Sequence, residues 1–344
     1  PGAQCTWKFS DGSPNADGCQ VSHTFHGGRA DQSVTLILED GDWKWESTRS
    51  ILLDRLEVVD VETLKGEGAA QGALPTRPEP GPTSFRFVVL ADTGVIQESN
   101  QGVQNAVKTL VETIKPEVVI HLGGQSSSSS NSDELRASIG RVGGPLERED
   151  ILTTWGMSPF DRANGLTPPK PSVQLVDGAH YPDHYSFTHK GAFFLVISTQ
   201  ARSGVSEDLI RWMRDSLSKA SIYESRYVLS YLPLHKFSDE HVGSLDKRFR
   251  LYELFLRARV TAVVSAGYRV FFEGRYGALP VISVGALSGE GGTLAGSDFP
   301  QQTSLLVVDQ VEGSKERAFA LEGPHFATVF DETLLPETVE VYTR

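Results

Sequence analysis

The chain has 344 residues, of which 39% are hydrophobic and 22% are charged. This is ordinary globular composition, and it leaves enough apolar residues for a sizeable core. A net charge of −12 and a pI of about 5.3 disfavour general electrostatic binding to nucleic acid or anionic lipid, because both are negatively charged. No apolar run approaches the roughly 18 residues that span a bilayer, so we expect no direct membrane span.

The sequence begins with Pro1 rather than Met, so we expect a processed or trimmed chain. Its two cysteines, Cys5 and Cys19, flank a short polar loop. A disulfide closing that loop would stabilise the fold by roughly 3 kcal/mol in the chain-entropy model. It would also predict the secretory pathway or another extracytoplasmic location, with membrane association through a removed segment or a partner left open. The alternative is two free thiols in the cytosol.

Residues 1–65 are expected to form a separate β-rich extension. Residues 33–38 alternate apolar with polar side chains, and residues 43–45 follow an acidic turn as a paired strand. His23 and His26 lie near the cysteines, but the spacing fits no closed zinc site. Residues 66–83, rich in Gly, Ala and Pro, are expected to be a linker.

From residue 84 to residue 344 the pattern changes to alternating strands and helices. Residues 85–90 form an apolar run, a helical apolar stripe follows over 103–114, and residues 118–122 form a second apolar run. Strand, helix and strand in this order predict a right-handed crossover with a parallel strand pair. Asp92 follows the first strand directly, where ligand sites lie in open α/β sheets.

The remaining elements are predicted from the same periodicities. Five consecutive serines, Ser126 to Ser130, indicate a solvated loop, and residues 150–172 are expected to be an irregular packed excursion. Further strands are expected at 172–176, 185–187, 192–198, 226–229 and 260–264, with closing antiparallel strands at 281–284, 304–308 and 318–321. Helices are expected over 209–217 and 251–258.

Several segments appear in an order that is typical of one family. They are His184-Tyr185-Ser186-Phe187, Trp212-Met213-Arg214-Asp215, Pro233-Leu234 and Ser265-Ala266-Gly267. Together with the Asp92 strand they make the region from about 85 to 341 resemble the calcineurin-like metallophosphoesterases, most closely the purple-acid-phosphatase type. The resemblance implies an α/β fold with two mixed β-sheets packed as a sandwich and flanked by helices. It also implies a family site in which two metal ions activate water and clamp a phosphate ester.

The chain departs from the family at most of its ligand positions. Asp92 is kept, and Gly94 is usual for the purple type. Where the family carries the bridging carboxylate, this chain has Gly124, and a tyrosine ligand is missing from the serine run. The vestigial positions, taken together, are Asp92, Gly94, Gly124, Ala179, His180, Tyr231, Gly267 and Arg269.

These replacements remove metal-binding groups. Ala179 replaces an asparagine ligand, Tyr231 replaces a histidine, and Gly267 and Arg269 replace two more histidines, whereas His180 is kept. Glycine and alanine offer no ligand, and arginine carries a fixed positive charge that opposes a nearby cation. We therefore expect no metal site, no catalytic residues and no cofactor.

Other interpretations of the same residues stay open. Asp92, Asp177, His180 and His235 could form a rearranged metal site, whereas His121 is expected to make a buried hydrogen bond. Arg269 could hold an anion with the turn amides near Gly124, or pair with Asp92 and fill the space of the metals.

The favoured prediction is a non-catalytic pseudo-phosphoesterase that acts as a scaffold or anchor for other proteins of unknown identity. Some degenerate members of the family serve as protein platforms, and the hydrophobic core of the sandwich does not depend on the metals. A metal-dependent phosphoesterase with relocated ligands and an anion-binding module are the alternatives. Nucleic acid is not expected as a partner.

Overall fold

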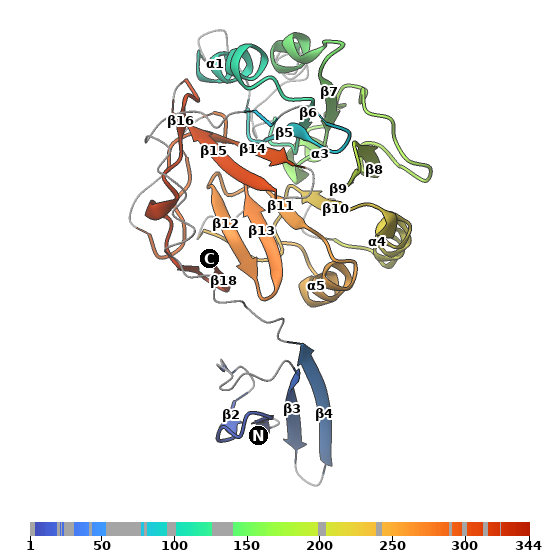
Figure 1. Ribbon diagram of the computed structural model, residues 1–344, viewed down its shortest axis with the longest axis vertical. Coiled ribbons are helices and arrows are strands. Elements are labelled where there is room, and N and C mark those ends of the chain that lie inside the picture. Colours follow the sequence, from blue (N-terminus) through green and yellow to red (C-terminus); the bar gives the residue numbers. More distant parts are fainter. Residues whose placement is uncertain are drawn as a thin grey trace. The chain divides into compact units, whose positions relative to one another are not determined.

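The computed structural model describes residues 4–18, 21, 23, 31–40, 43–52, 77–78, 81–94, 101–125, 140–198, 204–238, 243–288, 291–297, 301–311, 316–323 and 325–344. Cys19, the serine run and most of the 66–83 linker lie outside these residues. The chain divides into two compact units, Pro1–Ala69 and Ala70–Arg344, and Figure 1 labels their elements.

The first unit contains one antiparallel sheet with the strand order β2-β1-β3-β4. The strands are β1 (Gln4–Phe9), β2 (Ala16–Asp17), β3 (Asp31–Asp40) and β4 (Trp43–Leu52). Cys5 is buried, and the Gly18 amide donates a 2.8 Å hydrogen bond to its carbonyl. This brings the neighbour of Cys19 to Cys5, but Cys19 itself is not described, so the disulfide stays a prediction.

The second unit is built on two mixed sheets, as predicted. The six-stranded sheet has the order β16-β15-β14-β5-β6-β7. Its strands are β5 (Phe85–Leu90), β6 (Val118–His121), β7 (Leu152–Trp155), β14 (Ser304–Gln310), β15 (Arg317–Glu322) and β16 (Thr328–Val329).

The eight-stranded sheet has the order β17-β18-β12-β13-β11-β10-β9-β8. Its strands are β8 (His184–His189), β9 (Ala192–Ile197), β10 (Ser225–Ser230), β11 (Ala262–Ser265), β12 (Phe272–Tyr276), β13 (Leu279–Ser283), β17 (Thr338–Val339) and β18 (Tyr342–Thr343). Strands β9, β10, β11 and β13 run parallel, so their carboxyl ends lie at one edge of this sheet.

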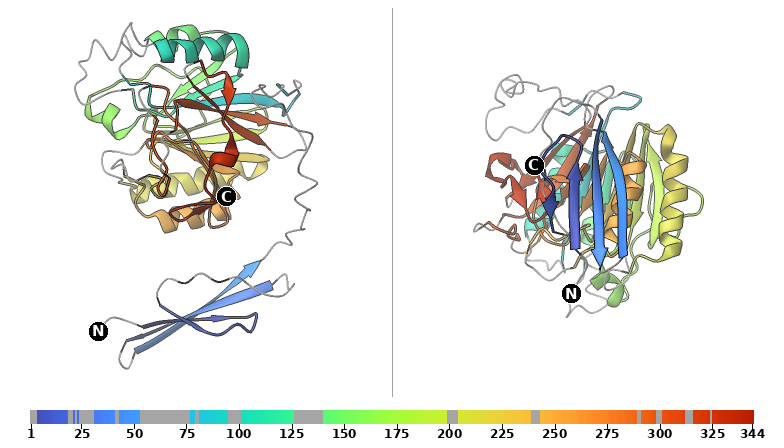
Figure 2. Two further views of the ribbon diagram at one scale, coloured as in Figure 1. Left: turned by 90° about the vertical axis from the view of Figure 1, so that its left-hand side faces the viewer. Right: turned by 90° about the horizontal axis from the view of Figure 1, so that it is seen from below.

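Helices cover the outer faces of both sheets (Figure 2). The helical segments are α1 (Gln101–Thr109) with a π-turn η1 (Leu110–Ile114), α3 (Pro159–Ala163), α4 (Glu207–Lys219) with η2 (Ala220–Ile222), α5 (Arg248–Arg257) and η3 (Glu332–Leu334). Residues 140–146 are also helical.

Strand β5 shows how the layers are held together. Phe87 belongs to the core between the sheets, where its ring lies 5.2 Å from that of Phe194 and 5.1 Å from that of Tyr227. Its neighbour Val88 faces the other way, into the core beneath α1. A strand buried on both faces reads as a continuous apolar run, which is why this strand could be predicted from its sequence.

Three predictions about the secondary structure need correction. Residues 172–176 form no strand and make only an isolated bridge from Leu175 to Phe187. The third parallel strand of the smaller sheet is instead β7 (Leu152–Trp155), inside the segment that we expected to be irregular. The strand predicted at 281–284 as a closing antiparallel strand is β13, which is antiparallel to β12 but parallel to β11. The polar threonines of β7 hid its strand character, because a short strand at a sheet edge needs no apolar run.

Among the described residues, no helix is long and apolar enough to cross a membrane.

Candidate functional site

Two strand ends of the smaller sheet meet directly at the predicted site. The Asp92 amide donates to the Gly123 carbonyl at 2.9 Å, and the Gly94 amide donates to the Gly124 carbonyl at 2.9 Å. Asp92 itself adopts a left-handed backbone with φ +51°. These bonds hold the turns after β5 and β6 together, so the side chain of Asp92 is fixed against the β6 turn.

The carboxylate of Asp92 has a protein partner from the larger sheet. Tyr231, directly after β10, donates a hydrogen bond of 2.6 Å from its hydroxyl to Asp92 Oδ1. Both residues are buried, with Asp92 6% and Tyr231 4% exposed. Tyr231, which the resemblance aligns with a metal-binding histidine, is therefore the direct hydrogen-bond partner of the Asp92 carboxylate.

Burial raises the pKa of Asp92 to about 6, although the Tyr231 hydrogen bond and the positive charge of Arg269 oppose the increase. The Gly267 amide also favours the charged form, yet Asp92 Oδ2 has no hydrogen-bond donor in good geometry among the described residues. Burial also raises the pKa of Tyr231 well above 10, and the nearby Asp92 charge adds to this. Tyr231 thus stays a neutral donor, and Asp92 is a carboxyl group that is costly to ionise.

Gly124 stands where the resemblance predicts a bridging acid, and the space beside it is already filled. A Cβ placed on Gly124 would lie 2.1 Å from Asp92 Oδ1 and 2.8 Å from Asp92 Cα. The backbone there has φ +82°, a conformation that disfavours any side chain. The carboxylate of Asp92 therefore lies in the volume that the missing side chain would need.

Asp161 is a site residue that our sequence analysis missed. It is fully buried, and it accepts backbone hydrogen bonds from Gly124 at 2.8 Å, Gln125 at 2.8 Å and Ser158 at 2.9 Å. Its own amide donates to the Ser158 hydroxyl, which completes a capping box at the start of α3. The Ser-Pro-x-Asp sequence before α3 was the available signal, since this spacing is typical of a capping box. The Asp161 carboxylate thus fixes the turn after β6 through hydrogen bonds to its backbone.

His121 lies in β6 and makes buried hydrogen bonds, as predicted. Its Nδ1 accepts from the Gly123 amide at 3.0 Å, which leaves Nε2 as the protonated nitrogen facing the Thr93 hydroxyl at 3.2 Å. Its ring stacks on Trp155 with centroids 4.9 Å apart. Burial lowers the pKa of His121 to about 4, against the opposing charge of Asp161. Both ring nitrogens of His121 therefore make hydrogen bonds within the protein.

Arg269 does not form the ion pair with Asp92 that we had considered. It is exposed, with a left-handed φ of +57°, and among the described residues it makes no ion pair within 4.0 Å. Its charge still lies near enough to lower the pKa of Asp92. Gly267, two residues earlier, has φ +89° and offers only its backbone. The group that satisfies Asp92 is a tyrosine, and the guanidinium faces solvent.

The segment from Asp177 to His180 makes none of these contacts. Asp177 and His180 are exposed, and Ala179 is half-buried. The His180 ring packs 4.8 Å from that of His184, whose ring in turn lies 4.6 Å from Trp212 on α4. Burial, and the like charge of His180, lower the pKa of His184. His180 is held by a neighbouring histidine at the surface of β8.

The backbone of His235 is hydrogen-bonded to the side chain of Tyr342. Its amide donates to the Tyr342 hydroxyl at 2.8 Å, and that hydroxyl donates to the His235 carbonyl at 2.6 Å. Burial lowers the pKa of His235. These contacts tie the segment after β10 to β18, at the C-terminal end of the chain.

The residues that the structure describes do not fit a dinuclear metal centre. No group of three or more His, Cys, Asp or Glu side chains that could hold a metal ion occurs in the described part of the chain. Asp92, Asp177, His180 and His235 all belong to that part and are not brought together. The Asp92 carboxylate accepts a hydrogen bond from Tyr231, and a Cβ at Gly124 would overlap Asp92 Oδ1.

Comparison with solved structures identifies the fold. The chain resembles GAP50, described as the anchor in the inner membrane complex of Plasmodium, with a TM-score of 0.50 and 14% identity, covering 70% of this chain and 85% of that one. The second unit has the metallophosphoesterase fold.

Two enzymes with this fold are similar to a comparable degree. The purple acid phosphatase PPD1 from yellow lupin (Lupinus luteus) matches with a TM-score of 0.52 and 10% identity over 96% of this chain and 68% of that one. A dimetal phosphatase from Danio rerio matches with a TM-score of 0.51 and 13% identity over 70% of this chain and 96% of that one. No protein-family model and no curated sequence matches. At these identities the likeness concerns the fold alone.

Proposed function

We propose that the chain is a non-catalytic pseudo-phosphoesterase that serves as a scaffold or anchor for other proteins. The observation that carries the proposal is the 2.6 Å hydrogen bond from Tyr231 to Asp92, beside a glycine that leaves no room for a bridging acid. A two-metal hydrolase needs a bridging carboxylate and several neutral imidazoles. Here the corresponding positions carry Gly124, Ala179, Tyr231, Gly267 and Arg269.

The scaffold part of the proposal is supported by the way the second unit is stabilised. Its cores contain large, fully buried side chains such as Phe87, Phe194 and Tyr227, and these lie between the sheets rather than at the strand ends. Burial of apolar surface stabilises such a body whether or not a metal is bound. A similar fold occurs in GAP50, whose description is that of an anchor.

The proposal is tested by a phosphoesterase assay with 4-nitrophenyl phosphate and added manganese, iron or zinc. The expected result is turnover no faster than in buffer containing the same metal. Turnover that disappears in Asp92→Ala would overturn the proposal and favour the alternative, a metal-dependent phosphoesterase with relocated ligands. Tyr231→Phe is assayed in parallel, because it removes the hydrogen bond to Asp92 Oδ1 and keeps the Asp92 carboxylate.

The secretory location is a second proposal, and it depends on the Cys5–Cys19 disulfide. The hydrogen bond from Gly18 to Cys5, 2.8 Å long, supports the pairing because it brings the residue before Cys19 to Cys5. Mass spectrometry after alkylation, with and without reductant, tests it. Alkylation of both cysteines without reductant would contradict the disulfide, and the location with it.

A further inference from the structure

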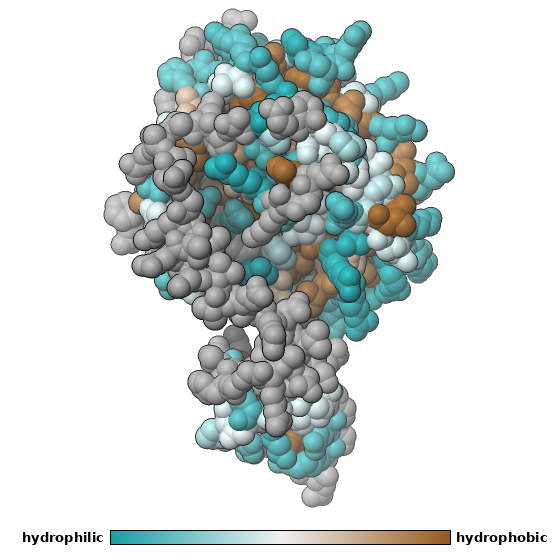
Figure 3. Space-filling model, viewed as in Figure 1, coloured by the Kyte–Doolittle hydropathy of each residue, from teal (hydrophilic) through white to brown (hydrophobic). Residues whose placement is uncertain are grey.

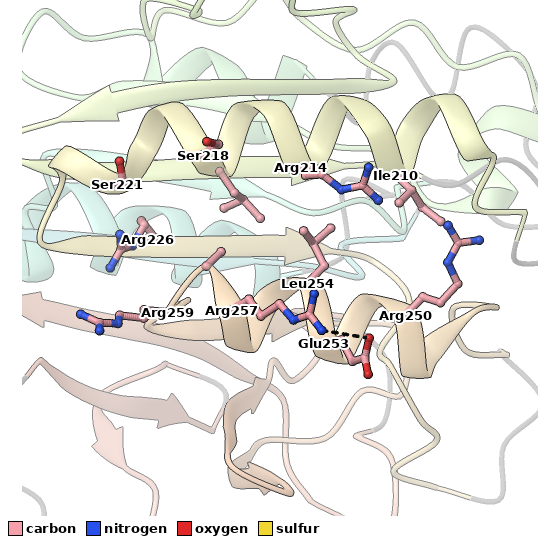
Figure 4. Close-up of a pocket in the computed structure, with 12 residues that line it drawn as sticks. Ile210, Arg214, Ser218, Ser221, Arg226, Arg250, Glu253, Leu254, Arg257 and Arg259 are labelled. Carbon is pink, nitrogen blue, oxygen red and sulfur yellow. Dashed lines mark ion pairs between the residues drawn. The ribbon is translucent and has the colours of Figure 1, made fainter. Parts of the chain in front are cut away.

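A groove of about 600 Å³ runs between helices α4 and α5 on the outer face of the eight-stranded sheet (Figure 4). The two helices are the crossovers that precede and follow β10, so they lie side by side with the start of that strand between them. The groove is lined by Ile210, Arg214, Leu217, Ser218, Ser221, Arg226, Arg250, Glu253, Leu254, Arg257, Ala258 and Arg259.

Positive charge is concentrated in this groove although the chain as a whole carries −12. Five arginines contribute to the lining and one acid does, among the described residues. Figure 4 shows Arg226 and Arg259 at one end of the groove, with Arg214, Arg257 and Arg250 toward the other end. Like charges at this spacing repel one another, so an arrangement of this kind is stabilised by an anionic ligand.

Only part of this charge is neutralised within the chain. Arg250 pairs with Glu207 at 2.6 Å, and Arg257 lies 3.9 Å from Glu253. Arg214, Arg226 and Arg259 make no ion pair within 4.0 Å among the described residues.

Arg226 is the most constrained of these arginines. Burial lowers its pKa, and the neighbouring charge of Arg259 lowers it further. Its Nε is buried without an acceptor in the described part of the chain. A buried donor without a partner is costly. A carboxylate of a ligand in the groove would supply the counter-charge that this guanidinium lacks among the described residues.

The floor of the groove is apolar, with Ile210 and Leu217 buried at its base. Three exposed apolar residues are each next in sequence to a residue that lines the groove. They are Ile222, which is 82% exposed, Phe249, 67%, and Leu256, 40%. Phe249 and Leu256 are seven residues apart on α5 and therefore share one face of the helix, next to the face of Arg250, Leu254 and Arg257. In Figure 3 apolar side chains lie among polar ones along the side of the second unit where Figure 1 draws α4.

We propose that this groove, named here the α4–α5 groove, docks an acidic segment of a partner protein whose apolar side chains alternate with carboxylates. The carboxylates pair with Arg214, Arg226 and Arg259, and the apolar side chains cover the exposed surface of Ile222, Phe249 and Leu256. The inference names the partner surface of the scaffold and in that respect rests on the proposed function. Arginine and aromatic side chains around an apolar floor are the composition that protein interfaces favour.

A protein segment fits the groove better than other anions. The groove is concave and lies between two helices, a shape that a peptide can enter and a flat bilayer cannot. None of the residues that line it is aromatic, so successive bases would find no series of rings to stack on inside the groove. Isolated phosphate would satisfy the arginines but would leave the apolar residues exposed.

The α4–α5 groove is separate from the vestigial site. Arg226 is at the start of β10, whereas Tyr231 follows its end. At 3.2–3.4 Å per residue, the five intervening steps place these two residues about 16 Å apart along the strand. Substitutions in the groove therefore leave the Asp92 contacts untouched.

The test measures fluorescence anisotropy with a labelled peptide of repeated Glu-Glu-Leu triplets and its Gln-Gln-Leu counterpart. We expect saturable binding of the acidic peptide to the full chain, and a loss of at least about tenfold in affinity in the double variant Arg214→Gln/Arg259→Gln. The matched control is Arg148→Gln/Arg211→Gln, which removes the same charge from exposed positions outside the groove. It should bind within about twofold of wild type.

Several results would overturn the docking proposal. Equal losses in the two double variants would show that net charge alone attracts the peptide, and equal binding of the Gln-Gln-Leu peptide would show that carboxylates are not recognised. Binding of phosphatidylserine vesicles without binding of the peptide would assign the groove to lipid. The phosphoesterase assay on the same protein distinguishes failure of the docking proposal from failure of the proposed function. Turnover of the ester together with intact peptide binding would refute only the non-catalytic function.

Discussion

The hydroxyl of Tyr231 lies 2.6 Å from Oδ1 of Asp92 and joins the carboxyl end of β10 in one sheet to that of β5 in the other. In a metal-dependent relative of this fold, the same edge of the sandwich would hold ions. Here a neutral donor satisfies one carboxylate oxygen, and the opposing turn has no side chain at Gly124. The strand ends of this protein are therefore joined by hydrogen bonds between residues of the same chain.

Replacing Tyr231 with phenylalanine is expected to destabilise the protein by about 1–3 kcal/mol at pH 7.5, because a buried carboxylate loses its donor. The matched control is Tyr227→Phe, which removes a buried hydroxyl whose acceptor is the neutral Gln310 amide, 2.8 Å away. That variant should lose about 1 kcal/mol. Urea unfolding of both variants measures the difference. A Tyr231→Phe loss no larger than that of Tyr227→Phe would contradict a charged acceptor.

The stability of the protein should depend on pH through Asp92. Its pKa rises from 3.8 in the unfolded chain to about 6 in the folded one, so between these values only the folded state holds the proton. The contribution of Asp92 to the free energy of unfolding is therefore highest below pH 4 and falls as the pH rises through pH 4–6.

Above that window the buried charge costs the folded state about 3 kcal/mol, at 1.36 kcal/mol per pKa unit. Asp92→Asn removes this dependence. We expect the variant to gain about 3 kcal/mol relative to wild type between pH 4 and pH 7.5, as measured by urea unfolding. A difference between the two proteins that does not change with pH would show that Asp92 has an ordinary pKa.

A methyl group at Gly124 should be poorly tolerated. Gly124→Ala combines the strain of φ +82° with a contact of 2.1 Å to Asp92 Oδ1. Gly296→Ala is the matched control, since its φ is +80° and nothing lies within 4 Å of the added Cβ. Strain alone costs about 1–2 kcal/mol, whereas the added overlap costs about 1–3 kcal/mol more.

Thermal unfolding of both glycine variants and of Gly124→Ala/Asp92→Gly tests this. The second substitution should recover part of the loss, because it removes the oxygen that Cβ meets. If Gly124→Ala and Gly296→Ala were equally stable, the Asp92 side chain would not occupy this space.

The buried ion pair between Arg86 and Asp309 offers a test of the sandwich itself. Arg86 Nε and Nη2 donate to the two carboxylate oxygens at 2.6 and 2.8 Å, and both side chains are 5% exposed. Asp309→Asn should destabilise by about 3–5 kcal/mol, since it removes the carboxylate that pairs with both donor nitrogens of a buried guanidinium. The control is Asp150→Asn in the exposed pair with Arg148, which should leave the stability close to that of the wild type because solvent screens the pair. Urea unfolding decides; equal losses would contradict the burial of the first pair.

Much of the fold followed from the sequence because its central strands are buried on both faces. Strand β5 and the end of β10 are apolar runs closed by small or polar residues, and such runs can be recognised without knowledge of their neighbours. Strand β7 was missed because its threonines resemble a loop. The isolated bridge at Leu175 was predicted as a strand because it is apolar, although it packs without extending the sheet.

The candidate site was predicted less completely, for a different physical reason. The sequence predicts that a ligand is missing at Gly124, since glycine has no side chain in any fold. It does not show which neighbour takes up the freed carboxylate, because that depends on side-chain directions set by packing between the sheets. Tyr231, and not Arg269, thus became the partner of Asp92. Asp161 lies 37 residues from Gly124 in the chain, and only the fold brings the two together.

The most direct test of the account is the metal content of the purified chain after dialysis against manganese, iron and zinc, measured by inductively coupled plasma mass spectrometry. A non-catalytic pseudo-phosphoesterase should retain far less than one ion per chain, with the same value for wild type and Asp92→Ala. Two ions per chain in the wild type, lost in Asp92→Ala, would contradict it.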